Sequence, residues 1–144
     1  MPEIARYLFL AGALPFLVLG IAHALATPLN VLDRKGLSPR DSGLAQSMAE
    51  TRPLLTKRTD MWLCWVGFNL SHSLGAVAFA LFVLLLGRDH ASFTTNAALG
   101  LPLAWLVSGC YLALAVKHWF RTPILGCAFS FACFSAAGLL RLFG

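Results

Sequence analysis

Four long apolar stretches dominate this sequence and limit what the chain can fold into. They cover residues 7–28, 61–87, 97–120 and 122–143, with charged residues only near their ends or between them. A spanning helix needs about 20 residues to cross a hydrocarbon core of about 30 Å. Because every backbone N–H and C=O in lipid must be bonded within its own segment, we interpret all four as helices. The predicted fold class is all-α: an integral membrane four-helix bundle, forming a single domain over residues 1–144.

The composition agrees with a membrane protein. Hydrophobic residues make up 58% of the chain and charged residues 12%, whereas soluble proteins carry about 25% charged residues. The first stretch also has features of a secretory signal, because Arg6 precedes it and Ala24-Leu25-Ala26 resembles a cleavage site. Its apolar run is longer than the about 7–15 residues of a signal peptide. We therefore interpret it as the first spanning helix.

The basic residues predict how the chain is oriented. Four crossings place both termini and the connection near residue 88 on one side, and the 29–60 connection and the turn near residue 121 on the other. Lys and Arg gather on the cytoplasmic side of membrane proteins. The first side holds three of the 11 basic residues and the second holds the other eight: Arg34, Lys35, Arg40, Arg52, Lys57, Arg58, Lys117 and Arg121. We expect a bacterial inner membrane protein with a cytoplasmic 29–60 loop and both termini outside. The net charge of +5 favours anionic lipid headgroups as partners, not nucleic acid.

The 29–60 loop contains the signals of a short helix between the first two spans. Ser38 is a candidate N-cap, Pro39 suits the first helical position, and Asp41 follows three residues after Ser38. Leu44 and Met48 are four residues apart and share one helical face. An apolar stripe with basic residues around it predicts a helix lying on the membrane surface; the alternative is a mobile cytoplasmic loop.

The other connections are short. Residues 88–96 predict a polar outer loop, and residues 121–123 a tight inner turn. Four cysteines lie inside the predicted helices without CxxC spacing, which is typical of small packing residues; a disulfide or a zinc site is the alternative. They are Cys64, Cys110, Cys127 and Cys133.

Small residues at helical spacing predict close helix packing in all four spans. In lipid, helices associate through small side chains that let their backbones approach. The second span has the longest such stripe, and each of the others has at least one pair. The stripe is Gly67, Ser71 and Gly75, and the pairs include Gly12 with Gly20, Ala104 with Ser108, and Gly126 with Ser130.

The second span also carries the most polar segment inside any predicted helix. Trp65, Asn69 and His72 follow i, i+4, i+7 spacing and so share one face. His72 lies eleven residues after Met61, which places it about 17 Å along the helix, close to the middle of the bilayer. An amide and an imidazole are costly there without partners. We therefore expect both to face the bundle interior or a wet cavity.

This segment, Trp-x-Gly-Phe-Asn-x-Ser-His-Ser-x-Gly over residues 65–75, resembles that of a group of small, uncharacterised bacterial membrane proteins with four helices. His23 late in the first span and the Lys117-His118-Trp119-Phe120-Arg121 end of the third are similar to the same group. The resemblance implies the four-helix topology and draws attention to these residues. It implies no reaction.

Depth along the helices groups further polar residues with Asn69 and His72. His23 and Thr27 lie near the cytoplasmic end of the first span, and Ser73 lies beside His72. His118, Lys117 and Arg121 lie at the cytoplasmic end of the third span. These positions predict a polar pocket in the inner leaflet, formed by His23, Thr27, Asn69, His72, Ser73 and His118. Lys117 and Arg121 would bind a phosphate or carboxylate headgroup there.

Three functions fit such a pocket. In the first, the polar residues only fix helix packing, and the chain is a non-catalytic binding or accessory component of a larger membrane assembly, with lipids and other subunits as partners. In the second, a histidine acts as acid or base in a lipid-active enzyme, or the pocket binds a lipid or small molecule. In the third, His23 and His72 hold a haem or a metal ion. The spans have no carboxylate in their centres and no GxSxG motif, so the sequence favours a non-enzyme and assigns no catalytic residue.

Overall fold

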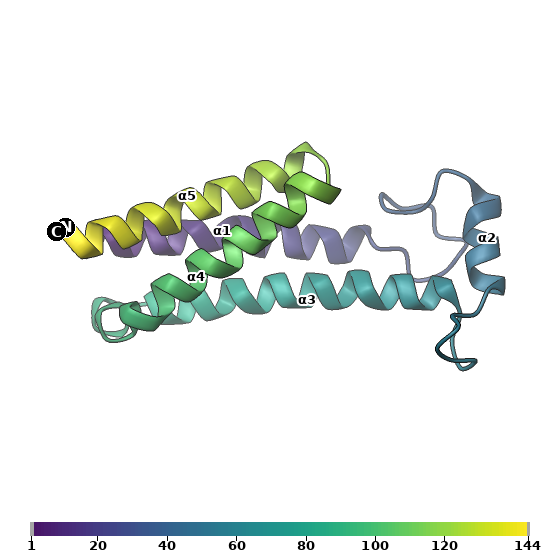
Figure 1. Cartoon of the computed structure of the whole chain (residues 1–144), viewed down its shortest axis with the longest axis horizontal. Coiled ribbons are helices and arrows are strands. Elements are labelled where there is room, and N and C mark those ends of the chain that lie inside the picture. The colour runs from purple at the N-terminus through teal and green to yellow at the C-terminus, as the bar shows by residue number, and fades with distance from the viewer. Residues whose placement is uncertain (1, 144) are drawn as a thin grey trace. The chain divides into compact units, whose positions relative to one another are not determined.

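The computed structural model describes residues 2–143, which form five helices (Figure 1). Four of them are long and apolar enough to cross a membrane: α1 (Pro2–Ala26), α3 (Met61–Gly87), α4 (His90–His118) and α5 (Arg121–Phe143). The fifth is the short α2 (Ser42–Glu50) between the first two spans. These helices confirm the all-α class, the four spans and the short intervening helix. The chain is a small multi-pass membrane protein.

The bounds of α3 are those predicted, but α4 begins earlier than expected. The prediction of a polar loop over residues 88–96 is wrong, because Asp89 is the N-cap of a helix that starts at His90. Its carboxylate accepts hydrogen bonds from the Ser92 backbone N–H at 2.8 Å and from the Ser92 hydroxyl at 2.9 Å. These bonds, which favour the charged form, hold the pKa of the Asp89 carboxyl below its usual range. The polar residues that follow Asp89 therefore form the first turns of a helix.

The short helix α2 starts four residues after the predicted cap. Asp41 is the N-cap and accepts from the Gly43 N–H at 2.8 Å. Ser38, the predicted cap, is engaged in the preceding turn, where its hydroxyl donates to the Asp33 carbonyl at 2.7 Å and accepts from the Lys35 N–H at 3.1 Å. The Ser38 hydroxyl therefore stabilises the preceding turn, and Asp41 caps the helix. The position of α2 on the membrane surface stays a prediction.

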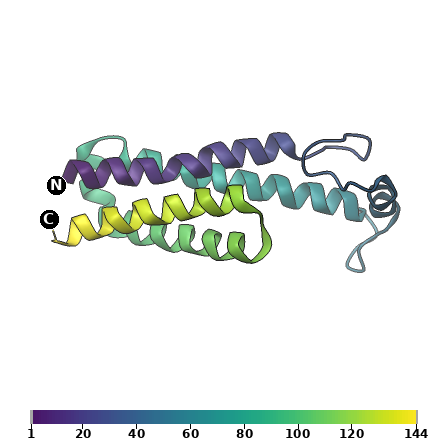
Figure 2. The ribbon, with the colours of Figure 1, turned by 90° about the horizontal axis from the view of Figure 1, so that it is seen from above.

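The chain divides into two compact units. Residues up to Leu19 and from Ala76 onward form one, which we call the aromatic unit; Gly20–Gly75 form the other, the histidine unit. In the aromatic unit, α4 and α5 run side by side in opposite directions (Figures 1 and 2). In the histidine unit, Ala45 of α2 packs in a small core with Trp62 and Val66 of α3.

Rings from every span meet in the core of the aromatic unit. Phe9 of α1 lies 5.4 Å from Phe93 of α4 and 5.7 Å from Phe134 of α5, between ring centroids. Phe16 contacts Phe79 of α3 and Tyr111 of α4 edge-on, at 4.9 and 5.1 Å. Tilted and edge-to-face pairs at these distances are favourable beyond the area they bury. Fully buried alanines on α1, α3 and α5 complete this core: Ala5, Ala13, Ala80 and Ala137.

The predicted small-residue faces are only partly used inside the chain. Gly12, Ala104 and Ser108 are buried, and a Cβ on Gly12 would lie 2.7 Å from the Phe134 ring. The stripe on α3 is exposed instead, and a Cβ on Gly67 would meet nothing within 4 Å. The prediction that Gly67, Ser71 and Gly75 pack within the bundle is therefore wrong, because α3 turns its opposite face inward.

Polar contacts join three helix ends in the aromatic unit. The Arg6 guanidinium donates to the Gly87 carbonyl at 3.1 Å and pairs with Glu3 at 3.0 Å. The second carboxylate oxygen of Glu3 lies 2.6 Å from His90 Nδ1. The start of α1, the end of α3 and the start of α4 therefore meet at one end of this unit. This arrangement agrees with a single side of the membrane for Arg6 and Arg88.

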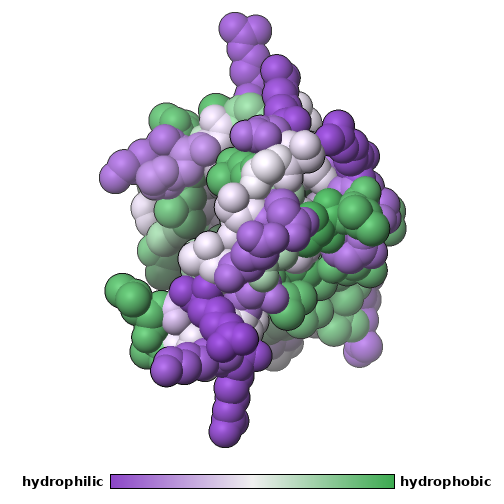
Figure 3. Space-filling model, turned by 90° about the vertical axis from the view of Figure 1, so that its right-hand side faces the viewer, coloured by the Kyte–Doolittle hydropathy of each residue, from purple (hydrophilic) through white to green (hydrophobic). Residues whose placement is uncertain are grey.

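The connection between α1 and α3 mixes basic and apolar side chains on its surface. Its six Lys and Arg residues are exposed, and so are Leu29, Leu32, Leu54 and Leu55. Figure 3, seen from the side on which α2 is drawn in Figure 1, shows hydrophilic side chains interspersed with apolar ones. Such a mixture suits a lipid headgroup region, where leucines enter the acyl boundary and basic groups remain near phosphate.

Candidate functional site

The polar segment of α3 meets the end of α1 in the histidine unit. His23 Nε2 and Asn69 Oδ1 are 2.9 Å apart, a hydrogen bond between the two helices. Both residues are partly buried, as the cost of exposing them to lipid requires. The structure thus brings together two of the residues that the sequence assigned to a polar pocket.

The hydrogen bonds of Asn69 determine which nitrogen of His23 carries a proton. The Asn69 amide Nδ2 donates to the Trp65 carbonyl one turn earlier, at 2.8 Å. Its oxygen therefore faces His23 as an acceptor, and His23 Nε2 must be the donor. The asparagine fixes both the orientation of the imidazole and its tautomer.

His72 adds a second imidazole to this cluster. Its ring centroid lies 5.4 Å from that of His23, with the planes at 64°. Both rings are partly buried. The two imidazoles are in edge-to-face contact, so they would have to separate to admit a haem between them.

Thr27 and Ser73, the hydroxyl residues predicted for the pocket, each bond to the backbone carbonyl four residues earlier. Thr27 Oγ1 donates to the His23 carbonyl at 2.9 Å, and Ser73 Oγ donates to the Asn69 carbonyl at 2.9 Å. Each residue is only 2% exposed. Their hydroxyl hydrogens stabilise the turns that carry His23 and Asn69, which is a packing role.

The predicted headgroup residues lie in the aromatic unit. Lys117 and His118 end α4, Arg121 begins α5, and all three are exposed. Lys117 and Arg121 place two positive charges at one tight turn, with the His118 imidazole beside them. Their participation in the pocket with Asn69 and His72 stays a prediction.

No group of three or more His, Cys, Asp or Glu side chains with metal-binding geometry occurs within residues 2–143. His23 and His72 supply a pair of ring nitrogens, short of the three protein ligands of a catalytic zinc site. All four cysteines are free thiols; Cys64 and Cys110 are exposed, and Cys127 and Cys133 are buried.

The sequence did not predict a second feature, a groove between α4 and α5. Its walls include alanines, a glycine and leucines that read as ordinary span residues. The groove exists only because α4 and α5 face each other, so no pattern in the sequence predicts it.

Comparisons of the chain with protein-family models, with curated proteins and with solved structures give no match. The resemblance based on residues 65–75 therefore stays an expectation.

Proposed function

We propose that this protein is a non-catalytic accessory component that associates with other chains in a larger membrane assembly. The observation that carries the proposal is the division of α3 into two faces. Asn69 and Ser73 lie on the inward face and are bonded within the chain. Gly67 and Ser71 lie on the opposite face and are exposed, and a Cβ on Gly67 would meet nothing within 4 Å.

The inward face favours packing over chemistry. The His23–Asn69 bond joins two helices, and the neighbouring hydroxyls donate to backbone carbonyls. A general acid or base needs its proton within reach of a substrate, whereas the Nε2 proton of His23 is held by Asn69. This geometry supports the accessory role over a lipid-active enzyme.

The outward face favours association. Small residues in membranes let two helices approach closely enough for backbone contact. Cys64, Gly67 and Ser71 share this face at i, i+3, i+7 spacing, beside the exposed Phe68 and Leu74. In each span, only 28% of the most apolar stretch is buried within the chain, so much apolar surface is left for lipid or for a partner.

Cys64 supplies a built-in probe of this face, one turn into α3. In native membranes, we expect a photoactivatable maleimide on Cys64 to form one protein adduct of defined mass. Gly67→Leu should reduce the adduct yield about tenfold, because losing close approach costs on the order of 1.4 kcal/mol. The mass of the adduct tells a second copy of the chain from a different subunit.

Two matched variants complete the experiment. Cys64→Ser should abolish the adduct, since the other exposed thiol, Cys110, lies on α4. Gly138→Leu makes the same change on α5, where a Cβ also meets nothing within 4 Å, and should leave the adduct intact. Lipid adducts alone, or a protein adduct that persists in Gly67→Leu, would contradict the proposal.

We propose that the protein resides in a bacterial inner membrane with the residue 29–60 connection in the cytoplasm, because eight of its basic residues are then inside. We also propose that anionic lipid contacts the basic side chains and exposed leucines of this connection.

A further inference from the structure

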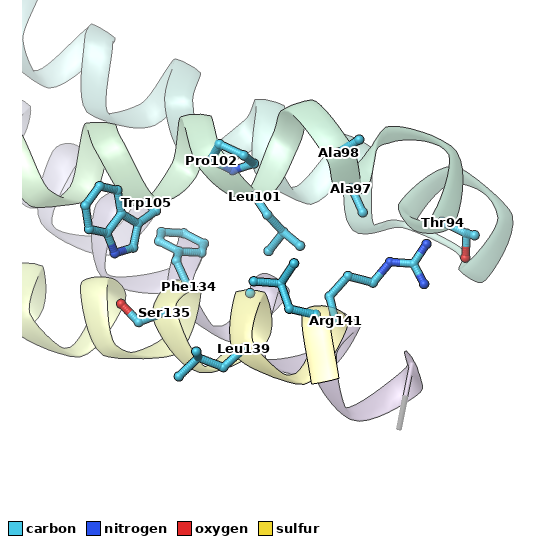
Figure 4. A pocket seen from close by; sticks show the side chains of 12 residues that line it. Thr94, Ala97, Ala98, Leu101, Pro102, Trp105, Phe134, Ser135, Leu139 and Arg141 are labelled. Carbon is cyan, nitrogen blue, oxygen red and sulfur yellow. The ribbon is translucent and has the colours of Figure 1, made fainter. Parts of the chain in front are cut away.

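The groove between α4 and α5 has a volume of about 530 Å³. Its walls are almost entirely apolar, with Ala97, Leu101 and Trp105 on α4 facing Phe134, Gly138 and Leu139 on α5. Figure 4 shows Thr94 and Arg141 near one end and Trp105 near the other. The groove is therefore apolar along most of its length, with one basic side chain, Arg141, near one end.

The length of the groove corresponds to one leaflet. Thr94 and Trp105 are eleven residues apart on α4, or about 17 Å along its axis. This is about half of a hydrocarbon core of about 30 Å. Arg141 lies in the last turn of α5, so its guanidinium is at headgroup depth when the groove is at acyl-chain depth.

Within residues 2–143, no carboxylate forms an ion pair with Arg141. Among the described residues, Glu3 pairs with Arg6 and also contacts His90, and Asp89 pairs with Arg88. Arg141 takes part in none of them and its side chain is exposed. A planar guanidinium binds phosphate through two parallel hydrogen bonds, so it complements a phosphate.

We propose that this groove binds one anionic phospholipid, with an acyl chain along Leu101 and Trp105 and the phosphate on Arg141. The apolar walls alone give little selectivity, because lipid tails are as apolar as leucine. Selectivity for an anionic headgroup must therefore come from Arg141. A partner helix in the groove would require an apolar surface along the whole span. This groove covers only one leaflet and has the charged Arg141 at one end.

Trp105 lines the groove and reports its occupant by fluorescence. The protein is reconstituted in phosphatidylcholine vesicles that contain brominated phosphatidylglycerol or, separately, brominated phosphatidylcholine. Quenching of Trp105 is the part of the signal that Trp105→Phe removes. We expect brominated phosphatidylglycerol to be effective at an about fivefold lower mole fraction, the effect of one basic residue at an anionic headgroup.

Variants separate the headgroup contact from the groove. Arg141→Gln should remove the fivefold preference, Arg141→Lys should keep most of it, and Arg88→Gln, which removes a paired charge, should leave it unchanged. Gly138→Leu adds a side chain to the groove wall, at a position where a Cβ meets nothing within 4 Å, and should lower quenching by both lipids. Gly67→Leu, the same change on α3, should have no effect.

Several results would overturn the proposal. Equal quenching by both phospholipids in the unmodified protein would mean that only unselective lipid contact occurs. A preference that survives in Arg141→Gln would place the headgroup elsewhere. Stronger quenching by a brominated fatty acid than by phosphatidylglycerol would assign the groove to a carboxylate lipid, and no Trp105 quenching by any lipid would mean that protein covers it.

Discussion

Asn69 is the residue on which the polar cluster depends, because both the nitrogen and the oxygen of its side-chain amide form hydrogen bonds. Its Nδ2 donates to the Trp65 carbonyl, and its Oδ1 accepts from His23 Nε2. An asparagine restrained by its own helix presents a fixed acceptor to α1. The histidine therefore has one preferred orientation, and His72 packs against its ring.

The His23–Asn69 bond should be measurable as an energetic coupling. We expect His23→Ala and Asn69→Ala each to lower the free energy of unfolding, and the double variant to lower it by less than their sum. The coupling should be about 0.6–1.7 kcal/mol, the range for interhelical hydrogen bonds in membranes. The measurement is reversible denaturation in mixed micelles by circular dichroism.

Asn69→Asp tests the tautomer in the same experiment. An aspartate is still an acceptor toward Nε2 but cannot donate to the Trp65 carbonyl, so part of the coupling to His23 should remain. Ser71→Ala, on the exposed face of α3, is the control and should show no coupling with His23→Ala. Additive effects of the His23 and Asn69 substitutions would refute the structural role of the bond.

At the scale of the helices, close approach between α1 and α5 depends on glycine. A Cβ at Gly12 would lie 2.7–3.0 Å from three ring atoms of Phe134, which packs against Phe9 in the aromatic core. A ring held among other rings cannot move away cheaply. We expect Gly12→Ala to lower the free energy of unfolding by about 1–3 kcal/mol, the usual cost of overpacking.

The same substitution at an open site gives the matched control. Gly67→Ala and Gly138→Ala add a methyl group where nothing lies within 4 Å. We expect both to be neutral or stabilising, since alanine favours helix over glycine by up to about 1 kcal/mol. Thermal denaturation of the three variants checks this order, and equal effects would show that Gly12 is not constrained by Phe134.

The sequence predicted the positions of the helices along the chain better than it predicted which face of each helix is buried. Apolar length alone indicates a span, so the number of spans and the bounds of α3 were predictable. Residue spacing shows that Gly67 and Ser71 share a face, but not where that face points, because the bundle interior and lipid are equally apolar. Asn69 was easier to place, since a buried amide needs a partner.

The sequence contains N-cap residues that mark the helix starts, but the polar residues after them favour a loop. Asp89 is a good N-cap residue, yet the polar run after it predicts a loop. His23 and Asn69, which depth placed near each other, are hydrogen-bonded in the structure, and the functional pocket around them stays a prediction. The groove at Arg141 was unpredictable, because it needs α4 and α5 to be placed against each other.

At the scale of the whole molecule, four crossings and the basic residues together predict the orientation. Eight basic residues lie in or beside the connections at 29–60 and 121, against three near the termini and residue 88. Lys and Arg in short loops resist translocation. The contacts of Arg6 with Gly87 and of Glu3 with His90 keep the start of α1 and the α3–α4 junction at one end of the aromatic unit.

Cysteine labelling tests this orientation in intact cells. In a variant whose four native cysteines are alanine, we place a cysteine at Gln46 on α2 or at Ala91 on α4, both exposed positions. A membrane-impermeant maleimide should label Ala91→Cys directly, and Gln46→Cys only after permeabilisation. Neutralising the six basic residues of the 29–60 connection leaves two against three, so some chains should then insert inverted and expose Gln46→Cys. Labelling of Gln46→Cys in intact cells without those changes would place the connection outside, and the basic residues would then act on a partner or lipid instead of on topology.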